Sequence, residues 1–538
     1  MEFKENGTEN TAKFDKLLLT NGAVVNTTYD DAGNNNFILE GNVVNDGGII
    51  SLDNPSHAQY TDSLTISGNY SASGDAVVKM NTLWNAPGDL HGTNSESDVL
   101  KIIGSASGVT RVITVNADGT EKIIDGNVKQ VTSVINTVPV VYVGTHSEEN
   151  AFIGDAETSG AITVQLAKRT AENGDQYYWT MKTEEPVNPL NPDKIKPGKK
   201  PIYSNAVAGY VAIPHINQEQ GFVSIGTLHE RRGEYLNTDT DNCPTCEAKP
   251  GRFANNRTWG RVFGKHVKQD GNDRLNLDTD IAGIQIGHDF LNRFNDDGSH
   301  NHTGAYIAYS RASTDFSDEY RAVNGLIADD KYTGKGKSNA ISLGVTNTFY
   351  LPNDSYVDLV GQVSYLRNKY EARNGNNPDS QDGWGLALSA EAGQAFELSK
   401  TVSGSWKIEP QAQLIYQYVN LDSFNDKYRY VDQNGQDSLR GRVGVRFGYD
   451  NFNAANSKPV IFYAVGNVWH DFINPSSVDV GKDSLREKYA KTWGEVGLGL
   501  KVAMQKNSFI YGDVRYEHDF GSTKREGYRG SLSFEHRW

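Results

Sequence analysis

The stretch GSLSFEHRW, residues 530–538, ends the chain with a strict alternation of side-chain type. One parity carries Tyr528, Gly530, Leu532, Phe534, His536 and Trp538, and the other carries Arg529, Ser531, Ser533, Glu535 and Arg537. Successive side chains of a β-strand point to opposite faces. The pattern therefore predicts a strand with one apolar and one charged face, although free chain ends are usually polar and loosely ordered.

About twelve segments of this kind fill residues 257–538, each about 12–17 residues long, whereas strands of globular sheets have a mode of about 5–6 residues. In residues 438–450 one face carries Leu439, Val443, Val445, Phe447 and Tyr449, and the other carries Arg440, Arg442 and Arg446. A soluble sheet also alternates, but its apolar face needs a second layer, and little apolar sequence remains to provide one. We therefore expect the apolar faces to contact lipid.

Aromatic residues gather near the ends of these segments, as the interfacial girdles of membrane barrels require. They are Trp259, Trp384, Trp406, Tyr449, Trp469, Trp493 and Trp538. Because unpaired strand edges do not occur in lipid, such a sheet must close. The sequence thus predicts an all-β chain whose residues 257–538 form a 12-stranded antiparallel transmembrane β-barrel, with the last strand paired to the first.

A polar helix is predicted just upstream, from Pro214 at the first helical position to Gly233 at the residue after the helix. The residues between them include His215, Asn217, Gln218, Glu219, Gln220, His229 and Glu230, so the helix is too polar to face lipid. It is either a surface helix or a helix inside the barrel. A twelve-stranded barrel is too wide for its own side chains to fill, which favours the second interpretation.

The N-terminal part, residues 1–185, is rich in Gly, Asn, Asp, Ser and Thr, with short Val, Ile and Leu strands between them. This pattern indicates all-β structure, and we expect a short parallel β-helix rather than a β-sandwich. Residues 186–202 are rich in Pro and Lys and predict a linker. Residues 203–256 then hold the helix and a connector.

Composition excludes some classes of function. The formal net charge of −15 argues against general nucleic-acid binding. The mean hydropathy is −0.57, and no apolar run approaches the roughly 18–20 residues of a membrane helix. The first sixteen residues lack the apolar core of a signal peptide, so we expect either a protein that is not exported or a fragment of a longer precursor.

The two cysteines, Cys243 and Cys246, form a CxxC pair in a connector rich in Pro and Asn. Such a pair can be a redox motif, half of a zinc site or a local disulfide. Since no second CxxC and no βαβ pattern accompany it, a local disulfide or an inert pair is the preferred interpretation.

The order of β-helix, linker, helix, twelve strands and terminal aromatic residue resembles the type Va autotransporters of Gram-negative outer membranes, in the group of AIDA and pertactin. The resemblance covers most of the chain. Three sets of residues carry it: Pro214, Gln218, Phe222, Leu228 and Arg231 in the expected lumen helix; Arg257, Trp259, Gly260, Arg261, Phe263 and Gly264 in the first strand; and Tyr528, Leu532, Phe534 and Trp538 in the C-terminal signal for membrane insertion.

The resemblance implies that barrel-assembly machinery inserts residues 257–538 into the outer membrane, with periplasmic chaperones as further partners. Residues 1–185 would be the C-terminal end of a passenger that reaches the cell surface. Relatives that cleave themselves carry an Asn-Asn pair in the lumen helix. Here the only nearby pair, Asn255-Asn256, lies before the first strand, so we expect an uncleaved helix.

We expect no cofactor, no metal and no catalytic residue, because no nucleophile motif or HExxH motif is present. The passenger is predicted to be an adhesin or a self-association factor, which would bind a host cell surface or identical passengers on other cells. The alternatives are a passenger enzyme, such as a protease or esterase, and a porin-like channel.

Overall fold

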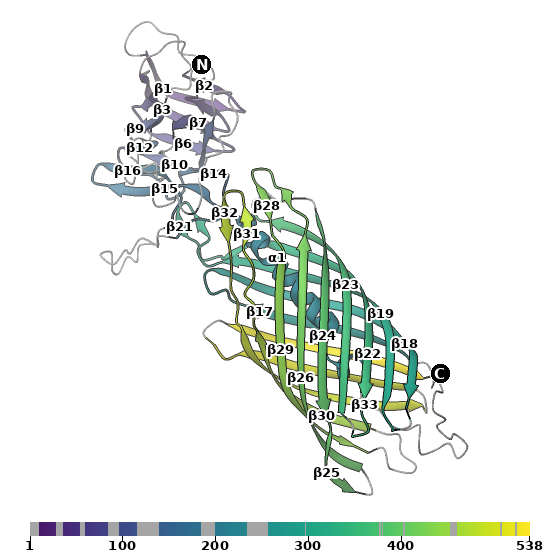
Figure 1. The fold of residues 1–538 in the computed structure, drawn as a ribbon. Coiled ribbons are helices and arrows are strands. Elements are labelled where there is room, and N and C mark those ends of the chain that lie inside the picture. The colour runs from purple at the N-terminus through teal and green to yellow at the C-terminus, as the bar shows by residue number, and fades with distance from the viewer. Residues whose placement is uncertain are drawn as a thin grey trace. The chain divides into compact units, whose positions relative to one another are not determined.

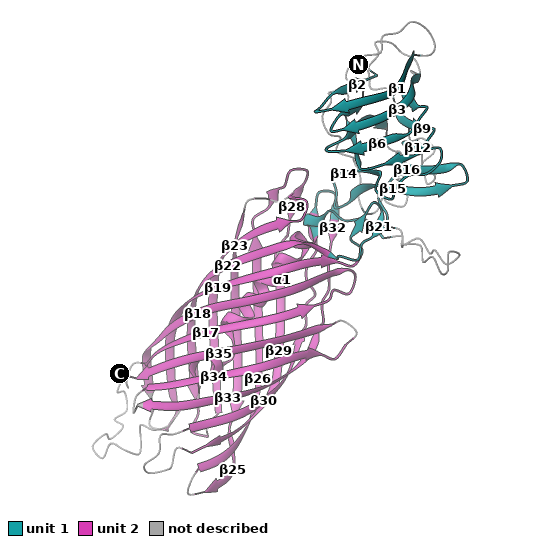
Figure 2. Ribbon diagram, turned by 180° about the vertical axis from the view of Figure 1, so that it is seen from behind, with its two compact units in different colours: residues 1–207, 320–331, 480–483 teal, residues 208–319, 332–479, 484–538 magenta. Residues whose placement is uncertain are grey.

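The computed structural model describes residues 10–27, 36–53, 60–83, 96–115, 128, 139–183, 200–233, 257–295, 297–353, 355–375, 378, 380–401, 404–451, 460–505, 508–521 and 524–537. The chain divides into two compact units (Figure 2). Unit 1 is Met1–Val207, Tyr320–Lys331 and Val480–Asp483, and unit 2 is Ala208–Glu319, Tyr332–Asp479 and Ser484–Trp538.

Unit 1 is a β-helix built from two sheets. The first has the order β10 (Ala106–Ser107), β6 (Tyr70–Ser73), β3 (Asn36–Asp46), β5 (Ser63–Ile66), β9 (Val99–Ile102), β12 (Val141–Val143), β16 (Gly174–Thr180), β15 (Thr163–Ala171) and β14 (Asp155–Glu157), with β1 (Asn10–Thr20) paired to β3. The second has the order β13 (Phe152–Ile153), β11 (Thr110–Val115), β7 (Val77–Leu83), β4 (Ile49–Ser51) and β2 (Val24–Asn26), with β8 (Glu96–Ser97) paired to β7.

Apolar side chains stack in register through this unit and form its core. The parallel ladder β3–β5–β9–β12 aligns Phe37, Leu64, Leu100 and Val141. The parallel ladder β2–β4–β7–β11 aligns Val25, Ile50, Val78 and Val112. All eight side chains are fully buried. Each coil therefore buries its apolar face on the next, as expected for a solenoid, and the predicted parallel β-helix is confirmed.

An antiparallel hairpin, β15–β16, closes one end of the solenoid, and Trp179 on β16 is fully buried beneath it. Asp175 on β16 accepts hydrogen bonds from the N–H and the hydroxyl of Ser147 (2.8 and 2.7 Å) and from the Thr170 hydroxyl (2.8 Å), and it pairs with Lys168 at 3.2 Å. Burial alone would raise the pKa of this carboxyl. The hydrogen bonds from Ser147, Thr170 and Lys168 outweigh that effect and lower the pKa to about 2.

Unit 2 is a closed barrel of antiparallel strands (Figure 1). In chain order its long strands are β17 (Arg257–Gln269), β18 (Leu275–Phe294), β19 (His300–Asp318), β22 (Tyr332–Tyr350), β23 (Ser355–Ala372), β24 (Gln381–Gln394), β26 (Gly404–Leu421), β29 (Gln436–Asp450), β30 (Val460–Asp471), β33 (Thr492–Gln505), β34 (Ser508–Asp519) and β35 (Arg525–Arg537). The short strand β25 (Phe396–Thr401) extends the sheet beside β26.

The ring closes where β17 pairs with β35 over its whole length, from Arg257 opposite Arg537 to Gln269 opposite Arg525. The predicted pairing of last strand with first is therefore confirmed, as is the twelve-stranded barrel. Several strands are longer than the sequence predicted, β18 with 20 residues and β19 with 19. Polar residues beyond the apolar band, which gave no alternating signal, continue the ladder there.

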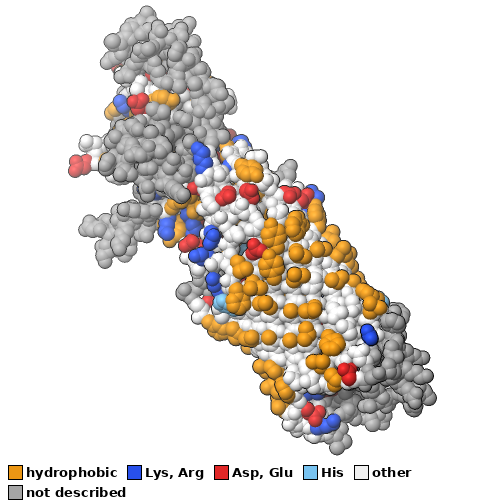
Figure 3. All heavy atoms as spheres, in the orientation of Figure 1, with side chains coloured by type: hydrophobic (Ala, Val, Ile, Leu, Met, Phe, Trp, Pro, Cys, Tyr) orange, Lys and Arg blue, Asp and Glu red, His pale blue; other side chains and the backbone are white. Residues whose placement is uncertain are grey.

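The strands alternate between the two sides of the barrel wall. On β33 and β34, Val496, Leu498 and Val514 face outward and are 61–67% exposed, whereas Glu495 and Arg515 point inward and are buried. On the face that Figure 3 shows, outward-facing hydrophobic side chains cover the middle of the barrel wall, and most charged side chains lie toward its two ends. Such a band is the surface that hydrocarbon covers in a membrane barrel.

The prediction that Trp259, Trp469 and Trp493 belong to the interfacial girdles is wrong, because all three are buried inside the barrel. Inward-facing aromatic rings lie against glycines of the neighbouring strand. A Cβ added at Gly344 would lie 2.1 Å from Cζ of Tyr306, and one added at Gly287 would lie 2.2 Å from Cζ2 of Trp259. Because real Cβ atoms do not approach so closely, these rings fit only where the adjacent strand carries no side chain.

The three longest connections between the long strands lie at one end of the barrel: residues 319–331, 422–435 and 472–491. The first contains the hairpin β20 (Ala322–Val323) and β21 (Leu326–Ile327). The last two contribute a small sheet of β27 (Phe424–Asn425), β28 (Tyr430–Asp432), β31 (Val478–Val480) and β32 (Asp483–Leu485). Arg257 and Arg537 mark the opposite end.

Candidate functional site

Two helices, α1 (Asn205–Ile225) and α2 (Leu228–Arg232), lie inside the ring of barrel strands (Figure 1). From Ala206 to Arg232 nearly every residue is buried, although the sequence is strongly polar. The prediction that one helix runs from Pro214 to Gly233 is wrong in its bounds. The helix begins nine residues earlier, Pro214 lies inside it, and a break at Gly226 separates α1 from α2. None of the described helices is both long enough and apolar enough to span a membrane.

The barrel wall compensates for the proline inside α1. A proline has no N–H, so the carbonyl four residues earlier loses its helical hydrogen bond. That carbonyl belongs to Tyr210, and the side-chain amide of Gln433 donates to it at 2.7 Å. The missing intrahelical donor is thus replaced by a side chain of the loop between β28 and β29.

Glu219, near the middle of α1, is 1% exposed and is surrounded by three cations from the barrel wall. Its carboxylate lies 2.5 Å from Arg440, 3.2 Å from Arg525 and 3.3 Å from Lys265. Those cations have further carboxylate partners: Arg440 pairs with Asp471, and both Arg525 and Lys265 pair with Glu517. A buried charge is tolerated only when it is paired in this way.

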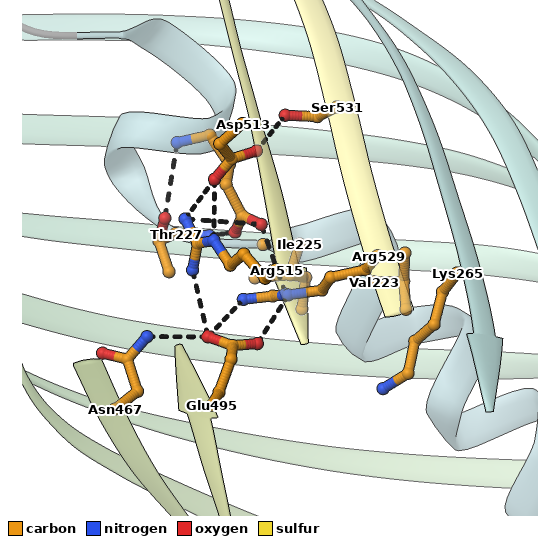
Figure 4. A network of polar contacts seen from close by, with 12 residues as sticks. Val223, Ile225, Thr227, Lys265, Asn467, Glu495, Asp513, Arg515, Arg529 and Ser531 are labelled. Carbon is orange, nitrogen blue, oxygen red and sulfur yellow. Dashed lines mark hydrogen bonds and ion pairs between the residues drawn. The ribbon is translucent and has the colours of Figure 1, made fainter. Parts of the chain in front are cut away.

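A second buried network surrounds Glu230 of α2. Arg529 lies 3.3 Å and Arg515 lies 3.7 Å from its carboxylate. Both arginines also bind Glu495, at 2.7 Å and 3.2 Å (Figure 4). Arg515 in addition pairs with Asp513 at 2.6 Å. The helix therefore contributes one anion to a network whose other members come from β33, β34 and β35.

The C-terminal end of α1 is capped by the barrel. Arg261 of β17 donates to the carbonyls of Val223 (3.2 Å) and Ser224 (2.6 Å). A cation at this position also favours the negative end of the helix dipole. Gly226 has φ of 57°, and a Cβ there would lie 2.6 Å from Nη1 of Arg261. Only glycine fits this break between the helices.

The short helix α2 begins with a capping box. The Thr227 hydroxyl accepts from the N–H of Glu230, and the Glu230 carboxylate accepts from the N–H of Thr227. Glu230 thus has two functions, as the cap of α2 and as the anion of its network.

The basic residues of α2 pair with acidic residues of the barrel strands β18, β23 and β26. Arg231 pairs with Asp358 of β23, and Arg232 pairs with Asp289 of β18. His229 lies 2.7 Å from Glu409 of β26.

Neutral side chains complete the contacts around α1. Asn217 donates to Ser338 (2.6 Å), Gln220 donates to Ser310 (2.9 Å), and Ser224 donates to Gln362 (3.0 Å). One cavity beside α1, lined by His215, Phe222 and Arg440 among others, measures about 30 Å³, room for about one water molecule. The residues of α1 and α2 are therefore packed against the barrel wall.

The structure places each residue singled out in the sequence as follows. Gln218 donates to the carbonyl of Gln436, the Phe222 ring lies 3.8 Å from the Arg440 guanidinium, and Leu228 is fully buried. Arg257 pairs with Glu535, and Phe263 lies against Gly283, while Gly260 and Gly264 belong to the outward-facing parity of β17. Tyr528, Leu532 and Phe534 face outward.

Several sequence expectations lie outside the described residues: Trp538, Cys243, Cys246, the pair Asn255-Asn256, most of the predicted linker and the connector 234–256. The wall residues that hold the helices, chiefly Lys265, Arg525 and Glu517, were not predicted from the sequence. The available signal was that Asp513, Arg515, Glu517 and Asp519 of β34 share one parity. Within the described ranges no group of three or more His, Cys, Asp or Glu side chains could hold a metal ion.

The family match and the related proteins of known name both indicate an autotransporter. The family description "Autotransporter beta-domain" matches residues 258–515. The adhesin BmaC autotransporter of Brucella suis biovar 1 (strain 1330) is 25% identical over 519 residues, which is 91% of this chain and 14% of that protein. The pertactin autotransporter of Bordetella parapertussis (strain 12822) is 23% identical over 263 residues, 48% of this chain and 26% of that protein.

Among solved structures, the transport unit of the autotransporter AIDA-I from Escherichia coli aligns with a TM-score of 0.48 and 15% identity, over 62% of this chain and all of that one. The chain spans only a minor part of the length of BmaC and of pertactin. The family match and these relatives cover the barrel and, in BmaC, most of the N-terminal unit as well. Residues 258–515 therefore match an autotransporter β-domain, and they lie in an outer-membrane β-barrel of the kind that is the translocator unit of such proteins.

Proposed function

We propose that unit 2 delivers residues 1–185 to the cell surface and anchors them there, and that these residues are the C-terminal end of a passenger. Residues 186–202 would be the linker, and residues 203–256 the lumen helix with its connector. The observation that carries this proposal is the path of the chain. Residues 205–232 cross a closed barrel and are held in it by ion pairs at Glu219 and Glu230.

The barrel would reach the membrane with the help of periplasmic chaperones and barrel-assembly machinery. The outward-facing residues Tyr528, Leu532 and Phe534, together with Trp538, would be the signal that this machinery reads. Support comes from their position on β35, which closes the ring with β17. A strand that completes the barrel is the last to find its partner, so it is available for recognition until closure.

The passenger itself we propose to be an adhesin or a self-association factor that binds host cell surfaces or identical passengers. Two features support this proposal. The adhesin BmaC covers 91% of this chain in alignment, and a parallel solenoid offers long flat faces suited to repeated weak contacts.

Protease treatment of intact cells tests the translocator function. The full chain, placed behind a secretory signal peptide, is expressed in a Gram-negative host. We expect added protease to remove residues 1–185 while the barrel remains in the membrane. Protection of residues 1–185 in intact cells, with cleavage only after the outer membrane is permeabilised, would contradict delivery to the surface.

The same cells test the adhesin function. Cells with the full chain should settle from suspension faster than cells in which residues 10–183 are deleted. Equal settling would contradict self-association by this part of the passenger, whereas the result of the protease experiment would stand independently.

Conductance separates a plugged translocator from a porin-like channel. Because α1 and α2 lie inside the barrel and are packed against its wall, we expect the purified barrel to pass little current in a planar bilayer, and we expect deletion of residues 203–233 to raise the conductance. Large, steady currents through the intact chain would favour a channel instead.

A further inference from the structure

On the outer face of the barrel, the side chains of three neighbouring strands, β19, β22 and β23, change from apolar to cationic within a few residues. The apolar band ends there in a row of paired residues, with Tyr309 opposite Ile341 and Ile341 opposite Tyr365. All three side chains face outward and are about half exposed. Tyrosines in this position mark the level at which the hydrocarbon meets the lipid headgroups.

Cationic residues come next along these strands, in the direction of the barrel end that carries the long connections. The next outward-facing row is Arg311, Asn339 and Arg367, in register across the three strands. The row after it contains Lys337 directly opposite Lys369. Each of the three strands therefore passes from the apolar band to a cation within two to four residues.

Only some of these cations form ion pairs within the protein. Lys337 pairs with Glu371, and Arg367 lies 3.8 Å from Asp382. In the part of the chain that the structure describes, neither Arg311 nor Lys369 makes an ion pair. Two lysines directly opposite each other on a sheet face destabilise it. Positive charge thus remains in excess at one level of the wall of a chain whose net charge is −15.

The carboxylates lie mainly farther from the apolar band. Asp315 and Glu371 occupy the row beyond Lys337 and Lys369, where Asp315 pairs with Lys335 at 3.3 Å. Two carboxylates lie in the rows of the cations themselves: Asp382 opposite Arg367, and Asp280 in the row of Lys337, where it pairs with His266. On β19, β22 and β23, however, the outward-facing charge nearest to the apolar band at this end is a cation.

An open apolar groove borders the cluster. It has a volume of about 1400 Å³, and its lining includes Val496, Leu498 and Val514 on the lipid-facing wall. Of the four cations only Arg311 lines it, beside Ser313 and Asp280. A ligand with an anionic head and hydrocarbon chains would place its head at Arg311 and its chains in this groove.

We propose that Arg311, Lys337, Arg367 and Lys369 bind the phosphate groups of a phosphorylated lipid in the outer leaflet of the outer membrane. In membrane barrels the longer loops face the exterior, so this cluster lies at the outer headgroup level. Clustered Lys and Arg at such a level attract anionic headgroups. A free phosphate ion could bind the same cations, but it has no hydrocarbon chains to occupy the adjoining groove.

The test measures binding of lipopolysaccharide to the detergent-purified full chain. The variant is Arg311→Gln with Lys369→Gln. Because neither residue forms an ion pair within the described structure, these substitutions deprive no carboxylate of its partner. The control is Arg293→Gln with Lys400→Gln, which removes two exposed cations at the opposite end of the barrel. We expect the first variant to bind roughly thirtyfold more weakly, and the control to bind as the unchanged chain does.

Two further arms identify the ligand. Lipopolysaccharide stripped of its phosphates should bind the unchanged chain as weakly as intact lipid binds the variant. Inorganic phosphate should not displace the intact lipid. Equal binding by variant and control would overturn the proposal, as would equal binding of stripped lipid or full displacement by phosphate. The heat stability of each variant, compared with that of the control, shows whether a loss reflects misfolding.

Discussion

At the scale of single residues, the lumen helix depends on donors that belong to the barrel. Pro214 removes one helical hydrogen bond, and Gln433 restores a donor for the carbonyl of Tyr210 at 2.7 Å. A buried carbonyl without a donor costs about 1–3 kcal/mol. The proline is thus compatible with this helix only inside this barrel.

A double-mutant cycle measures that dependence. Gln433→Leu should lower the free energy of unfolding by about 1–3 kcal/mol in the native chain. It should cost less in a Pro214→Ala background, because the alanine would supply the helical N–H itself. The measurement is chemical unfolding of the detergent-solubilised chain. Equal losses in the two backgrounds would show that the contact with Tyr210 contributes nothing.

The glycines beneath aromatic rings make a second prediction at this scale. Gly344→Ala places a Cβ 2.1 Å from the Tyr306 ring and should destabilise the barrel by about 1–3 kcal/mol. The temperature at which the folded band disappears on gel electrophoresis reports the change. Gly466→Ala is the matched control, since its Cβ would meet no atom within 4 Å. Similar temperatures for both variants would refute the packing argument.

At the scale of elements, the hairpin β15–β16 closes the solenoid through a buried carboxylate. Asp175 has a folded pKa of about 2, below the value of about 3.9 in an unfolded chain. A depressed pKa stabilises the fold at pH values above the unfolded value, and the contribution disappears as the pH falls through the folded value. The difference corresponds to roughly 2.6 kcal/mol.

This linkage predicts how unit 1 responds to acid. Cleavage within residues 139–183 by pepsin, followed by mass spectrometry, should increase as the pH falls from about 4 to about 2. Asp175→Asn should make the hairpin more susceptible already at the upper end of this range and should flatten the pH dependence. Asp155→Asn, on the exposed face of β14, is the control. A native pH profile in the Asp175 variant would contradict the assignment.

At the scale of the whole molecule, the decisive feature is the medium that the barrel wall contacts. Leu498 lies at the middle of β33 and is 66% exposed to the outside. Leu498→Arg should destabilise the barrel in lipid bilayers by about 2–4 kcal/mol. Met504→Arg, near the end of the same strand, should cost only about 0–1 kcal/mol. Unfolding titrations in liposomes measure both, and equal costs would mean that the wall does not face hydrocarbon.

Much of the architecture was predictable from the sequence because side chains alternate with a period of two along a strand. The parity of residues 528–537 and the long alternating segments before them indicate which face meets lipid. The helix bounds were less predictable. Within a helix, proline usually occupies the first position, so the sequence predicted that the helix begins at Pro214. An interior position is tolerable here because Gln433, which is distant in sequence, donates to the carbonyl of Tyr210.

The sequence by itself therefore determined the class of the fold, the closure of the barrel and the inward direction of its charges, since these follow from local periodicity and from the need to pair every strand in lipid. The tertiary structure alone decided which charges meet. Glu219 is paired with Arg440 and Arg525, which lie 221 and 306 residues away. Periodicity states on which side of the wall a charge lies, but only ring closure and strand register bring particular partners together.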